Sequence, residues 1–435
     1  SASGMVRLSI DDSPFGADSQ AVRPAPDFRE GDMVYLYRYE GVPDVRRSIL
    51  YKGTLQELST DSVTIALNDA QHNPDIFRPD DSDTWAVEHG GSDVGTSSAI
   101  RSLHQFITCA PRRKALLLGQ RAPETDGSLR LSRSYHPSYD EVLLKVKQAR
   151  DYFLLVGPPG TGKTSMALRF MVEEELAHTR TQEGATAGAG SDAPLPGGGL
   201  LLTAYTNRAV DEISAMLCDA RLPFLRLGRA ASCDVRYRPY LLDTALAKTR
   251  KLDDARRLIA DTPIIVATTS MLQAQPWVLE LKHFSLAIVD EASQILEPSV
   301  IGLLGSPAVE RFVLVGDHKQ LPAVVQQSPE QTVVKELCLR DIGLEDCRQS
   351  LFERLLHQEH RLGRTQFTGT LHTHGRMHPD VARFPLFHFY QREKLQPVPL
   401  PHQQEASLGY DLAAEDQLDE QLKSRRLLFL PNEGD

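Results

Sequence analysis

Five nearly continuous apolar runs dominate the middle of the chain. These runs are FLLV (153–156), LLLTAY (200–205), PIIVAT (263–268), LAIVD (286–290) and FVLVG (312–316). Strands buried on both faces, as in a parallel sheet covered by helices, have this pattern. Between the runs the chain alternates between loop and helix patterns. Residues 151–356 are therefore predicted to form an α/β domain with a parallel sheet.

A different pattern precedes this domain. Residues 27–97 contain short runs rich in Val, Ile, Tyr and Thr, namely MVYLYRY, ILYKGTLQEL, SVTIALND and TWAVEH, broken by Gly, Pro, Asn and Asp. This predicts a small β-barrel or antiparallel sheet. Residues 1–26 are polar and predict a flexible tail. Residues 98–150 predict a helical stalk and linker, with a break or kink at Pro111.

Composition sets the broad class of protein. The 435 residues are 41% hydrophobic and 24% charged, which is typical of globular domains and sufficient for two or three of them. No run approaches the roughly 18 apolar residues of a membrane-spanning helix, and the first residues do not have the pattern of a signal peptide. Five cysteines without CxxC spacing indicate reduced thiols. We therefore expect an intracellular protein with no membrane partner.

Charge is unevenly distributed along the chain. The net charge is −10, but residues 221–257 contain ten Lys and Arg and only four acidic residues. Such a segment can follow a phosphate backbone, and it can equally be a solvated charged surface. Charge alone leaves both interpretations open. Residues 183–199, EGATAGAGSDAPLPGGG, are of low complexity and predict a flexible surface insertion.

A glycine-rich loop follows the first apolar run. The segment GPPGTGKT fits G-x-x-x-x-G-K-[ST] between a strand and a predicted helix, and it comprises Gly157, Pro158, Pro159, Gly160, Thr161, Gly162, Lys163 and Thr164. Backbone N–H groups of such a loop surround phosphate oxygens, and the helix N-terminus favours an anion. Lys163 would contact the β- and γ-phosphates, and Thr164 would bind Mg²⁺. ATP and Mg²⁺ are the expected cofactors.

An acidic pair ends the fourth apolar run. Asp290 and Glu291 close LAIVDE, at the end of a strand where parallel sheets bind their ligands. Asp290 is expected to hold Mg²⁺ together with Thr164, since this cation needs only one or two carboxylates. Glu291 is expected to orient and polarise the attacking water.

Four segments resemble motifs of superfamily 1 helicases. They are TAYTNRAVDEI (203–213), VDEASQ (289–294), VGDHKQLPAVV (315–325) and GRMHPDVARFPLFHFYQREKL (375–395), and they stand in the family's order. The group they resemble most comprises the 5′-to-3′ helicases related to the nonsense-mediated-decay helicase and the Okazaki-fragment nuclease–helicase. The resemblance implies a RecA-like P-loop domain preceded by a small β-barrel on a helical stalk. Residues 357–435 would then begin a second RecA-like domain, left incomplete.

The resemblance also implies roles for individual residues. Gln320 would sense the γ-phosphate, and Arg376 would reach it as an arginine finger. Four residues would contact the backbone of a nucleic-acid strand, namely Thr206, Asn207, Thr268 and Thr269; for the two threonines at 268 and 269, ordinary strand-end hydroxyls are the alternative. Tyr139, Asp140 and Glu141 stand at the distance where the family usually has a glutamine that reads adenine, and Gly375 stands where it has a tyrosine.

These features predict an ATP-dependent helicase or translocase that moves 5′-to-3′ on a single strand, with DNA slightly favoured over RNA. The family's later motifs V and VI are not found, so we expect this chain to bind nucleotide, to need the remainder of the second RecA-like domain as a partner, and to unwind little alone. One alternative is an ATPase that remodels protein–nucleic-acid complexes without unwinding. Another is a non-catalytic nucleotide-binding interaction module.

Overall fold

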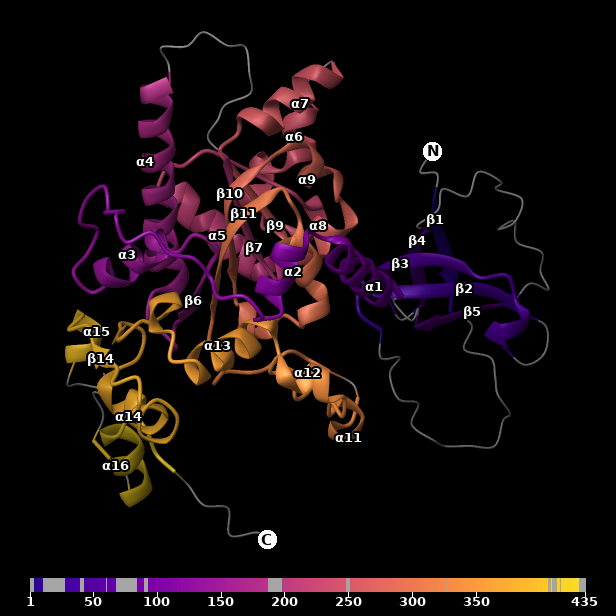
Figure 1. Ribbon diagram of the computed structural model, residues 1–435. Helices are drawn as coiled ribbons and strands as arrows, with labels where there is room; N and C mark the ends of the chain where they lie inside the picture. The colour runs from indigo at the N-terminus through magenta and orange to yellow at the C-terminus, as the bar shows by residue number, and fades with distance from the viewer. Residues whose placement is uncertain are drawn as a thin grey trace. The chain divides into compact units, whose positions relative to one another are not determined.

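The computed structural model describes residues 4–10, 28–39, 43–59, 61–67, 84–89, 93–186, 198–247, 251–325, 327–405, 408, 413–414 and 416–429. The chain divides into two compact units, residues 1–97 and 98–435, and each is described by itself (Figure 1). No helix in the described ranges is long and apolar enough to cross a membrane.

The first unit is a five-stranded antiparallel sheet in the order β1-β4-β3-β2-β5. Its strands are β1 (Met5–Ser9), β2 (Met33–Tyr39), β3 (Tyr51–Leu58), β4 (Ser62–Leu67) and β5 (Thr84–His89), with one short 3₁₀ helix at Val45–Arg47. Val34, Leu36, Leu55 and Ile65 form its core. The four runs predicted from the sequence are strands, but no pairing of β1 with β5 is present among the described residues. Closure into a barrel therefore stays a prediction.

The predicted tail at residues 1–26 is wrong for Met5–Ser9. This segment is strand β1, which pairs with β4 so that Val6 faces Ile65. Val6 is buried and Leu8 packs against the same core. The segment MVRLS alternates apolar and polar residues, as an edge strand with one buried face requires. Residues 1–3 and 11–26 of the predicted tail lie outside the described residues.

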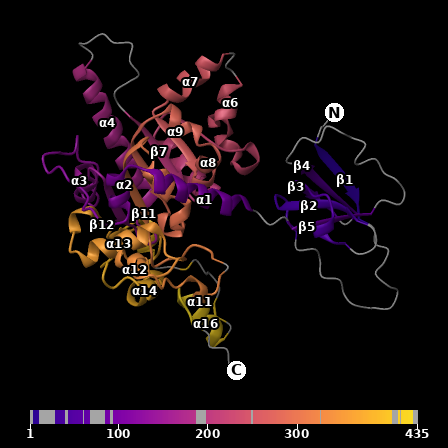
Figure 2. The same cartoon turned by 45° about the vertical axis from the view of Figure 1, so that its right-hand side comes forward.

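The second unit contains a seven-stranded sheet, all parallel, in the order β12-β6-β11-β10-β7-β9-β8. The strands are β6 (Tyr152–Val156), β7 (Gly199–Ala204), β8 (Phe224–Arg226), β9 (Ile264–Thr268), β10 (Phe284–Asp290), β11 (Val309–Gly316) and β12 (Thr368–Thr370). All five apolar runs are strands of this sheet, which confirms the prediction. Every residue of β6, β7 and β9 is buried, because helices cover both faces (Figures 1 and 2).

The helices of the described residues include α1 (Asp93–Thr108), α2 (Pro111–Leu117), α3 (Asp140–Gln148), α4 (Arg169–Thr186), α5 (Asn207–Asp219), α6 (Leu242–Leu246), α7 (Leu252–Asp261), α8 (Thr269–Ala274), α9 (Trp277–Leu281), α10 (Ile301–Gly305), α11 (Pro329–Thr332), α12 (Leu337–Asp341), α13 (Leu351–Arg361), α14 (Pro379–His388), α15 (Pro401–Gln404) and α16 (Gln417–Ser424). Pro111 separates α1 from α2 and begins α2, as predicted from its missing N–H.

The predicted end of the first domain at residue 356 is wrong. Strand β12 pairs with β6 at the edge of the seven-stranded sheet, and α13 runs on to Arg361 beneath it. The Tyr152 hydroxyl on β6 donates to the buried Glu359 carboxylate at 2.8 Å, which ties α13 to the sheet. Beyond Thr370, β13 (Thr373–His374) pairs in parallel with β14 (Gln396–Pro397), with α14 between them. A second RecA-like domain starting here stays a prediction.

The predicted insertion at residues 183–199 is shorter in the structure. Helix α4 continues to Thr186 and β7 begins at Gly199. Residues 187–197 lie outside the described residues. The glycines near the end of α4 led the sequence interpretation to stop the helix too early, because glycine disfavours helix only modestly.

Candidate nucleotide-binding site

The sheet brings the predicted motifs to one edge. Strands β6, β11 and β10 are adjacent, and their carboxyl ends are aligned, with Gly316 opposite Val156. Strand β7 lies on the other side of β10, with Ala204 opposite Asp290. The glycine-rich loop, the acidic pair and the loop after β11 therefore follow neighbouring strands. Parallel α/β sheets bind ligands at this edge.

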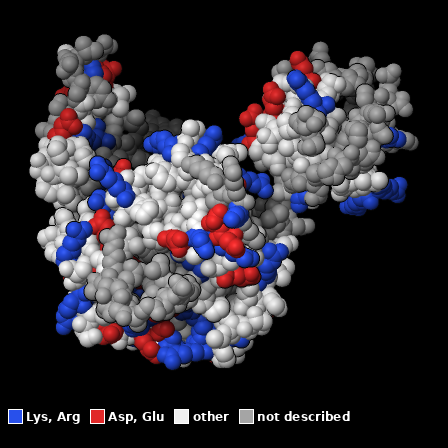
Figure 3. All heavy atoms as spheres, turned by 90° about the horizontal axis from the view of Figure 1, so that it is seen from above, with Lys and Arg blue, Asp and Glu red and all other residues white. Residues whose placement is uncertain are grey.

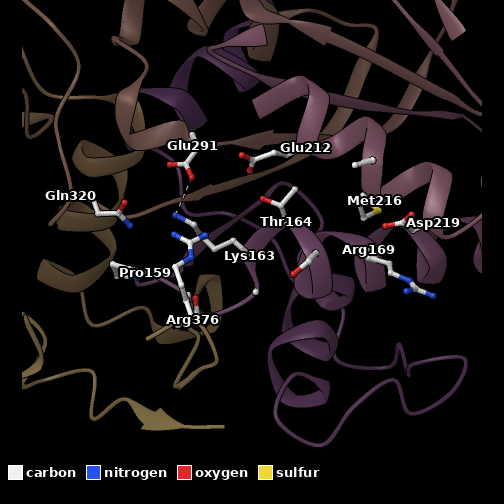
Figure 4. A pocket seen from close by; sticks show the side chains of 15 residues that line it. Pro159, Lys163, Thr164, Arg169, Glu212, Met216, Asp219, Glu291, Gln320 and Arg376 are labelled. Atoms are coloured by element: carbon white, nitrogen blue, oxygen red, sulfur yellow. Dashed lines mark ion pairs between the residues drawn. The ribbon is translucent and has the colours of Figure 1, made fainter. Parts of the chain in front are cut away.

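A cavity of about 350 Å³ opens at this edge (Figure 4). The residues that line it are Pro159, Gly160, Thr161, Gly162, Lys163, Thr164, Ser165, Arg169, Glu212, Ala215, Met216, Asp219, Glu291, Gln320 and Arg376. Figure 4 shows Lys163, Glu291, Gln320 and Arg376 around one part of the cavity, with Arg169 and Asp219 at another. All five residues predicted to act in catalysis except Asp290 line it.

The glycine-rich loop has the backbone that its sequence requires. Gly160 and Gly162 adopt positive φ angles of 74° and 69°, which other residues rarely adopt. A Cβ on Gly160 would meet the Cβ of Arg376 at 2.5 Å, so glycine also permits close approach of that segment. The buried Thr161 hydroxyl donates to the Pro158 carbonyl at 2.7 Å and closes the turn. A helical turn at Lys163–Leu168 follows and leads into α4, so backbone N–H groups face the cavity.

Thr164 and Asp290 are in direct contact. The Thr164 hydroxyl donates to Asp290 Oδ2 at 2.6 Å. Asp290 is buried at the end of β10, and this burial raises the pKa of its carboxyl group to about 6, opposed by the Thr164 hydrogen bond. A buried carboxylate next to a hydroxyl at a phosphate loop is a suitable pair of ligands for Mg²⁺. The two residues assigned to the metal are thus brought together.

Lys163 and Glu291 face each other across the cavity. Their Nζ and Oε1 atoms are 3.2 Å apart, as the dashed line in Figure 4 marks. Glu291 has a positive φ of 52°, an uncommon conformation for a residue other than glycine. Such strain is found at functional sites, where surrounding structure holds the residue in place.

Gln320 and Arg376 complete this side of the cavity. The Gln320 side-chain amide donates to Asp317 Oδ2 at 2.8 Å. The segment that carries Arg376 is bound to the phosphate loop, because the Gly375 N–H donates to the Gly160 carbonyl at 2.8 Å. The residues fit the group that the sequence predicts: Lys163 and Arg376 side chains and the start of the helical turn for phosphates, and the Thr164–Asp290 pair for Mg²⁺.

The sequence interpretation did not identify the role of Tyr139. Its buried hydroxyl donates to the Thr161 carbonyl at 2.9 Å, and Thr373 hydrogen-bonds to the same hydroxyl. A Cβ on Gly162 would lie 2.7 Å from it. Tyr139 therefore supports the phosphate loop and links it to β13, which precedes Arg376. The sequence places Tyr139 upstream of the phosphate loop, but it does not indicate which residues Tyr139 contacts.

The structure separates the four predicted nucleic-acid residues into two groups. Thr206 and Asn207 are exposed at the start of α5, where the Thr206 hydroxyl caps the helix by accepting from Ala209 N–H. Thr268 and Thr269 are buried, and the Thr268 hydroxyl caps α8. The helix cap is the ordinary role for these hydroxyls. Contact of all four with nucleic acid stays a prediction.

The basic segment 221–257 is partly neutralised. Arg226 is buried and pairs with Asp211, and Arg236 pairs with Asp234. On the face drawn in Figure 3, Lys and Arg lie interspersed with Asp and Glu. Arg226 is thus a structural residue, whereas exposed cations of the segment, such as Arg229, are accessible to a phosphate backbone.

The sequence around this site is similar to that of known proteins. Residues 137–254 and 244–328 match the AAA domain family. The "DNA replication ATP-dependent helicase/nuclease DNA2" of Gallus gallus is 35% identical over 217 residues, which are 49% of this chain and 18% of that protein. The protein of the same name from Mus musculus is 28% identical over 355 residues, 77% of this chain and 29% of that protein. The chain thus spans less than a third of these relatives' length.

Among solved structures, the "Arterivirus nonstructural protein 10 (helicase)" is 12% identical, with a TM-score of 0.32 over 92% of this chain and 59% of that one. That score is too low to support an argument. The family match covers strands β6 to β11 of the seven-stranded sheet and every residue that lines the cavity except Arg376. The chain is therefore related in sequence to the DNA replication ATP-dependent helicase/nucleases, and its residues 137–254 and 244–328 match the AAA domain family.

Proposed function

We propose that this chain binds and hydrolyses ATP as part of a helicase motor that moves 5′-to-3′ along single-stranded nucleic acid, with DNA favoured. The observation that carries the proposal is the arrangement of Lys163, Thr164 and Glu291 around one cavity, with Asp290 hydrogen-bonded to Thr164. The relatives are named as DNA replication ATP-dependent helicase/nucleases, which supports DNA over RNA. The chain spans only part of the length of those relatives, so movement along nucleic acid by the whole protein is also part of what we propose.

In this proposal the phosphate loop binds the triphosphate through its N–H groups and Lys163. Thr164 and Asp290 hold Mg²⁺, which neutralises phosphate charge when bound. Glu291 accepts a hydrogen bond from the attacking water and takes up its proton. Gln320 and Arg376 contact the γ-phosphate, and the guanidinium fork of Arg376 matches its oxygens. The chain supplies one wall of a cleft, and closure of that cleft by the remainder of a second domain drives movement.

The segment after Thr370 supports the second-domain part of the proposal. Strands β13 and β14 pair in parallel with α14 between them, which is how an α/β domain is built. Contacts between the protein and a nucleic-acid strand would be mainly to its phosphates. The affinity for nucleic acid should therefore weaken as the salt concentration rises and should depend little on base sequence. Arg229, Thr206 and Asn207 are exposed candidates for these contacts.

The experiment is ATP hydrolysis measured with and without single-stranded DNA or RNA, on this chain and on one extended through a complete second domain. We expect stimulation by single-stranded DNA in the extended chain, abolished by Lys163→Ala and by Glu291→Gln. Lys145→Ala on α3 is the matched control, because Lys145 is outside the cavity and pairs with Glu141 on the same helix. Stimulation without strand separation would favour the remodelling ATPase, and no hydrolysis in either chain would favour the interaction module.

A further inference from the structure

A buried carboxylate connects the cavity to the segment that follows α14. The side chain of Asp317 is fully buried, and its Oδ2 accepts from both Gln320 Nε2 and Tyr390 Oη, each at 2.8 Å. Its Oδ1 accepts from the Lys319 N–H at 3.1 Å. The Asp317 N–H donates to the Ser293 hydroxyl at 3.1 Å, which ties the loop to the segment after β10. Asp317 is therefore held on several sides.

Lys319 makes a second contact with the same segment. Its ammonium donates to the Phe389 carbonyl at 2.9 Å and pairs with the Glu393 carboxylate. The ammonium also lies 5.5 Å from the centre of the Tyr390 ring. Residues 389–393 follow α14, about 70 positions later in the chain. Lys319 in the loop after β11 thus contacts residues 389–393 through a hydrogen bond and an ion pair.

The hydrogen bond from Gln320 determines which end of its amide faces the cavity. A carboxylate only accepts, so the NH₂ group of Gln320 lies towards Asp317, and one of its two N–H donors is used there. The Tyr390 hydroxyl satisfies a second acceptor position on the same oxygen. Without the Tyr390 hydroxyl, the buried Asp317 carboxylate lacks one hydrogen-bond donor. This loss favours a different position of the Asp317 side chain.

Tyr390 remains a donor throughout the neutral pH range. Burial, followed by the hydrogen bond to Asp317, raises the pKa of its hydroxyl group. The phenol therefore keeps its proton and can donate to Asp317 throughout this range. A tyrosine held in this way transmits the position of its own segment to the carboxylate it contacts.

We propose that Tyr390 is a positioning residue that acts through Asp317 on Gln320, so that the position of residues 389–393 sets how well the cavity distinguishes a nucleoside triphosphate from a diphosphate. The inference rests on the proposed function, in which Gln320 contacts the γ-phosphate. Diphosphates lack that group, so their binding does not depend on Gln320.

The experiment measures dissociation constants of the 435-residue chain for a non-hydrolysable ATP analogue and for ADP, both with Mg²⁺. For Tyr390→Phe we expect affinity for the analogue to fall about tenfold, the effect typical of one lost hydrogen bond, with ADP affinity within about twofold. In a chain that already carries Gln320→Ala, adding Tyr390→Phe should lower the ratio of the two affinities no further, because both changes act through the same amide.

Tyr152→Phe is the matched control. Its hydroxyl also donates to a buried carboxylate at 2.8 Å, that of Glu359, but neither residue lines the cavity. We expect this variant to lose comparable thermal stability and to keep the affinity ratio of the unsubstituted chain. If Tyr390→Phe does not fold, Glu393→Gln weakens the second contact and should lower the ratio by a few-fold in the same direction.

An unchanged ratio in Tyr390→Phe, or a loss that adds to that of Gln320→Ala, would overturn the inference and leave Tyr390 with a purely structural role. In that case, binding of the ATP analogue by the unsubstituted chain would still support the proposed function. If the unsubstituted chain binds neither nucleotide, both the inference and the proposed function are wrong. The two failures are thus distinguishable.

Discussion

The ammonium of Lys163 lies 3.2 Å from the carboxylate of Glu291, across the cavity at the edge of the seven-stranded sheet. The two side chains to which we assign phosphate binding and water activation thus neutralise each other when no nucleotide is bound. A bound triphosphate would draw Lys163 to its own oxygens and leave Glu291 available to a water molecule. This ion pair is the basis of the first prediction.

Glu291→Gln should separate binding from hydrolysis. The substitution removes the charge that holds Lys163, so ATP affinity should rise by about two- to fivefold, as expected for a partly exposed ion pair. Hydrolysis should fall by about 10² or more, because an amide cannot take up the proton from water. Equilibrium binding and single-turnover hydrolysis measure the two effects.

Glu310→Gln is the control for that change. Glu310 lies outside the cavity and is half-exposed beside Arg150. The ATP affinity and the hydrolysis rate of Glu310→Gln should stay within about twofold of those of the unsubstituted chain. Equal loss of binding and hydrolysis in Glu291→Gln would show that Glu291 acts in folding and not on water.

Binding that requires Mg²⁺ should depend on pH through Asp290. Burial raises the pKa of its carboxyl group to about 6, so folding favours the protonated form, and nucleotide-free protein should gain stability as pH falls through 6 towards the unfolded value near 4. Cation binding has the opposite sign because it needs the carboxylate. The increase in ATP affinity caused by Mg²⁺ should be about fourfold smaller at pH 5.5 than at pH 7.5.

Titrations of ATP with and without Mg²⁺ at the two pH values test this. ATP itself gains a proton in the same range, so Asp290→Asn provides the reference. That variant should show only the pH dependence of the nucleotide. A pH effect of the same size in Asp290→Asn would mean that Asp290 is not the titrating group.

Tyr139→Phe should weaken nucleotide binding without unfolding the chain. The change removes the hydrogen bond to the Thr161 carbonyl and leaves the ring packed against Phe170. The loss of one such bond is about 1 kcal/mol, so affinity for both ATP and ADP should fall by about three- to tenfold. Isothermal titration measures both.

Tyr135→Phe is a close control for Tyr139. Its ring also packs against Phe170, but its hydroxyl donates to Glu174 and not to the phosphate loop. Nucleotide affinity should not change. If both variants lose affinity equally, general loosening around Phe170 is the cause, and not the support of the loop by Tyr139.

The basic segment should divide into structural and surface residues. Arg226→Met removes the cation that pairs with Asp211, and should lower the free energy of unfolding by about 2–3 kcal/mol, reduced from a fully buried pair because Asp211 is partly exposed. The exposed Arg229→Met should change stability by no more than about 0.5 kcal/mol. Denaturant unfolding measures both.

For the affinity for nucleic acid, we expect the larger effect at Arg229 and the smaller one at Arg226. Arg229→Met should weaken binding to single-stranded DNA and reduce its dependence on salt, because one phosphate contact is lost. Arg226→Met, measured where it is folded, should leave the salt dependence unchanged. A change in salt dependence in Arg226→Met but not in Arg229→Met would show that the nucleic-acid strand does not contact Arg229.

The sequence was sufficient for the features that depend on local pattern. Continuous apolar runs predicted five buried strands, and the spacing of glycines with Lys163 predicted a phosphate loop after the first of them. Asp290 was predicted at the end of its strand, and the parallel sheet then brings it to Thr164, 126 residues earlier in the chain. Parallel strands necessarily place their carboxyl ends together, so this contact follows from the pattern.

Features that depend on which segments meet in space were not predictable. Tyr139 contacts Thr161 and Tyr390 contacts Asp317, and neither pair has a spacing that signals a hydrogen bond. Strand β12 has only three residues, TGT, so its apolar pattern is too short to recognise. Strand β1 was missed for the same reason, with polar residues around a five-residue run.

The most direct test of the central claim, that the cavity is a nucleotide site, is calorimetric titration of the 435-residue chain with ATP and Mg²⁺, beside Lys163→Ala. We predict binding of about one ATP per chain, weakened about tenfold or more in Lys163→Ala through loss of a charged phosphate contact. Binding of equal strength in both chains, or no binding in the unsubstituted one, would contradict the account.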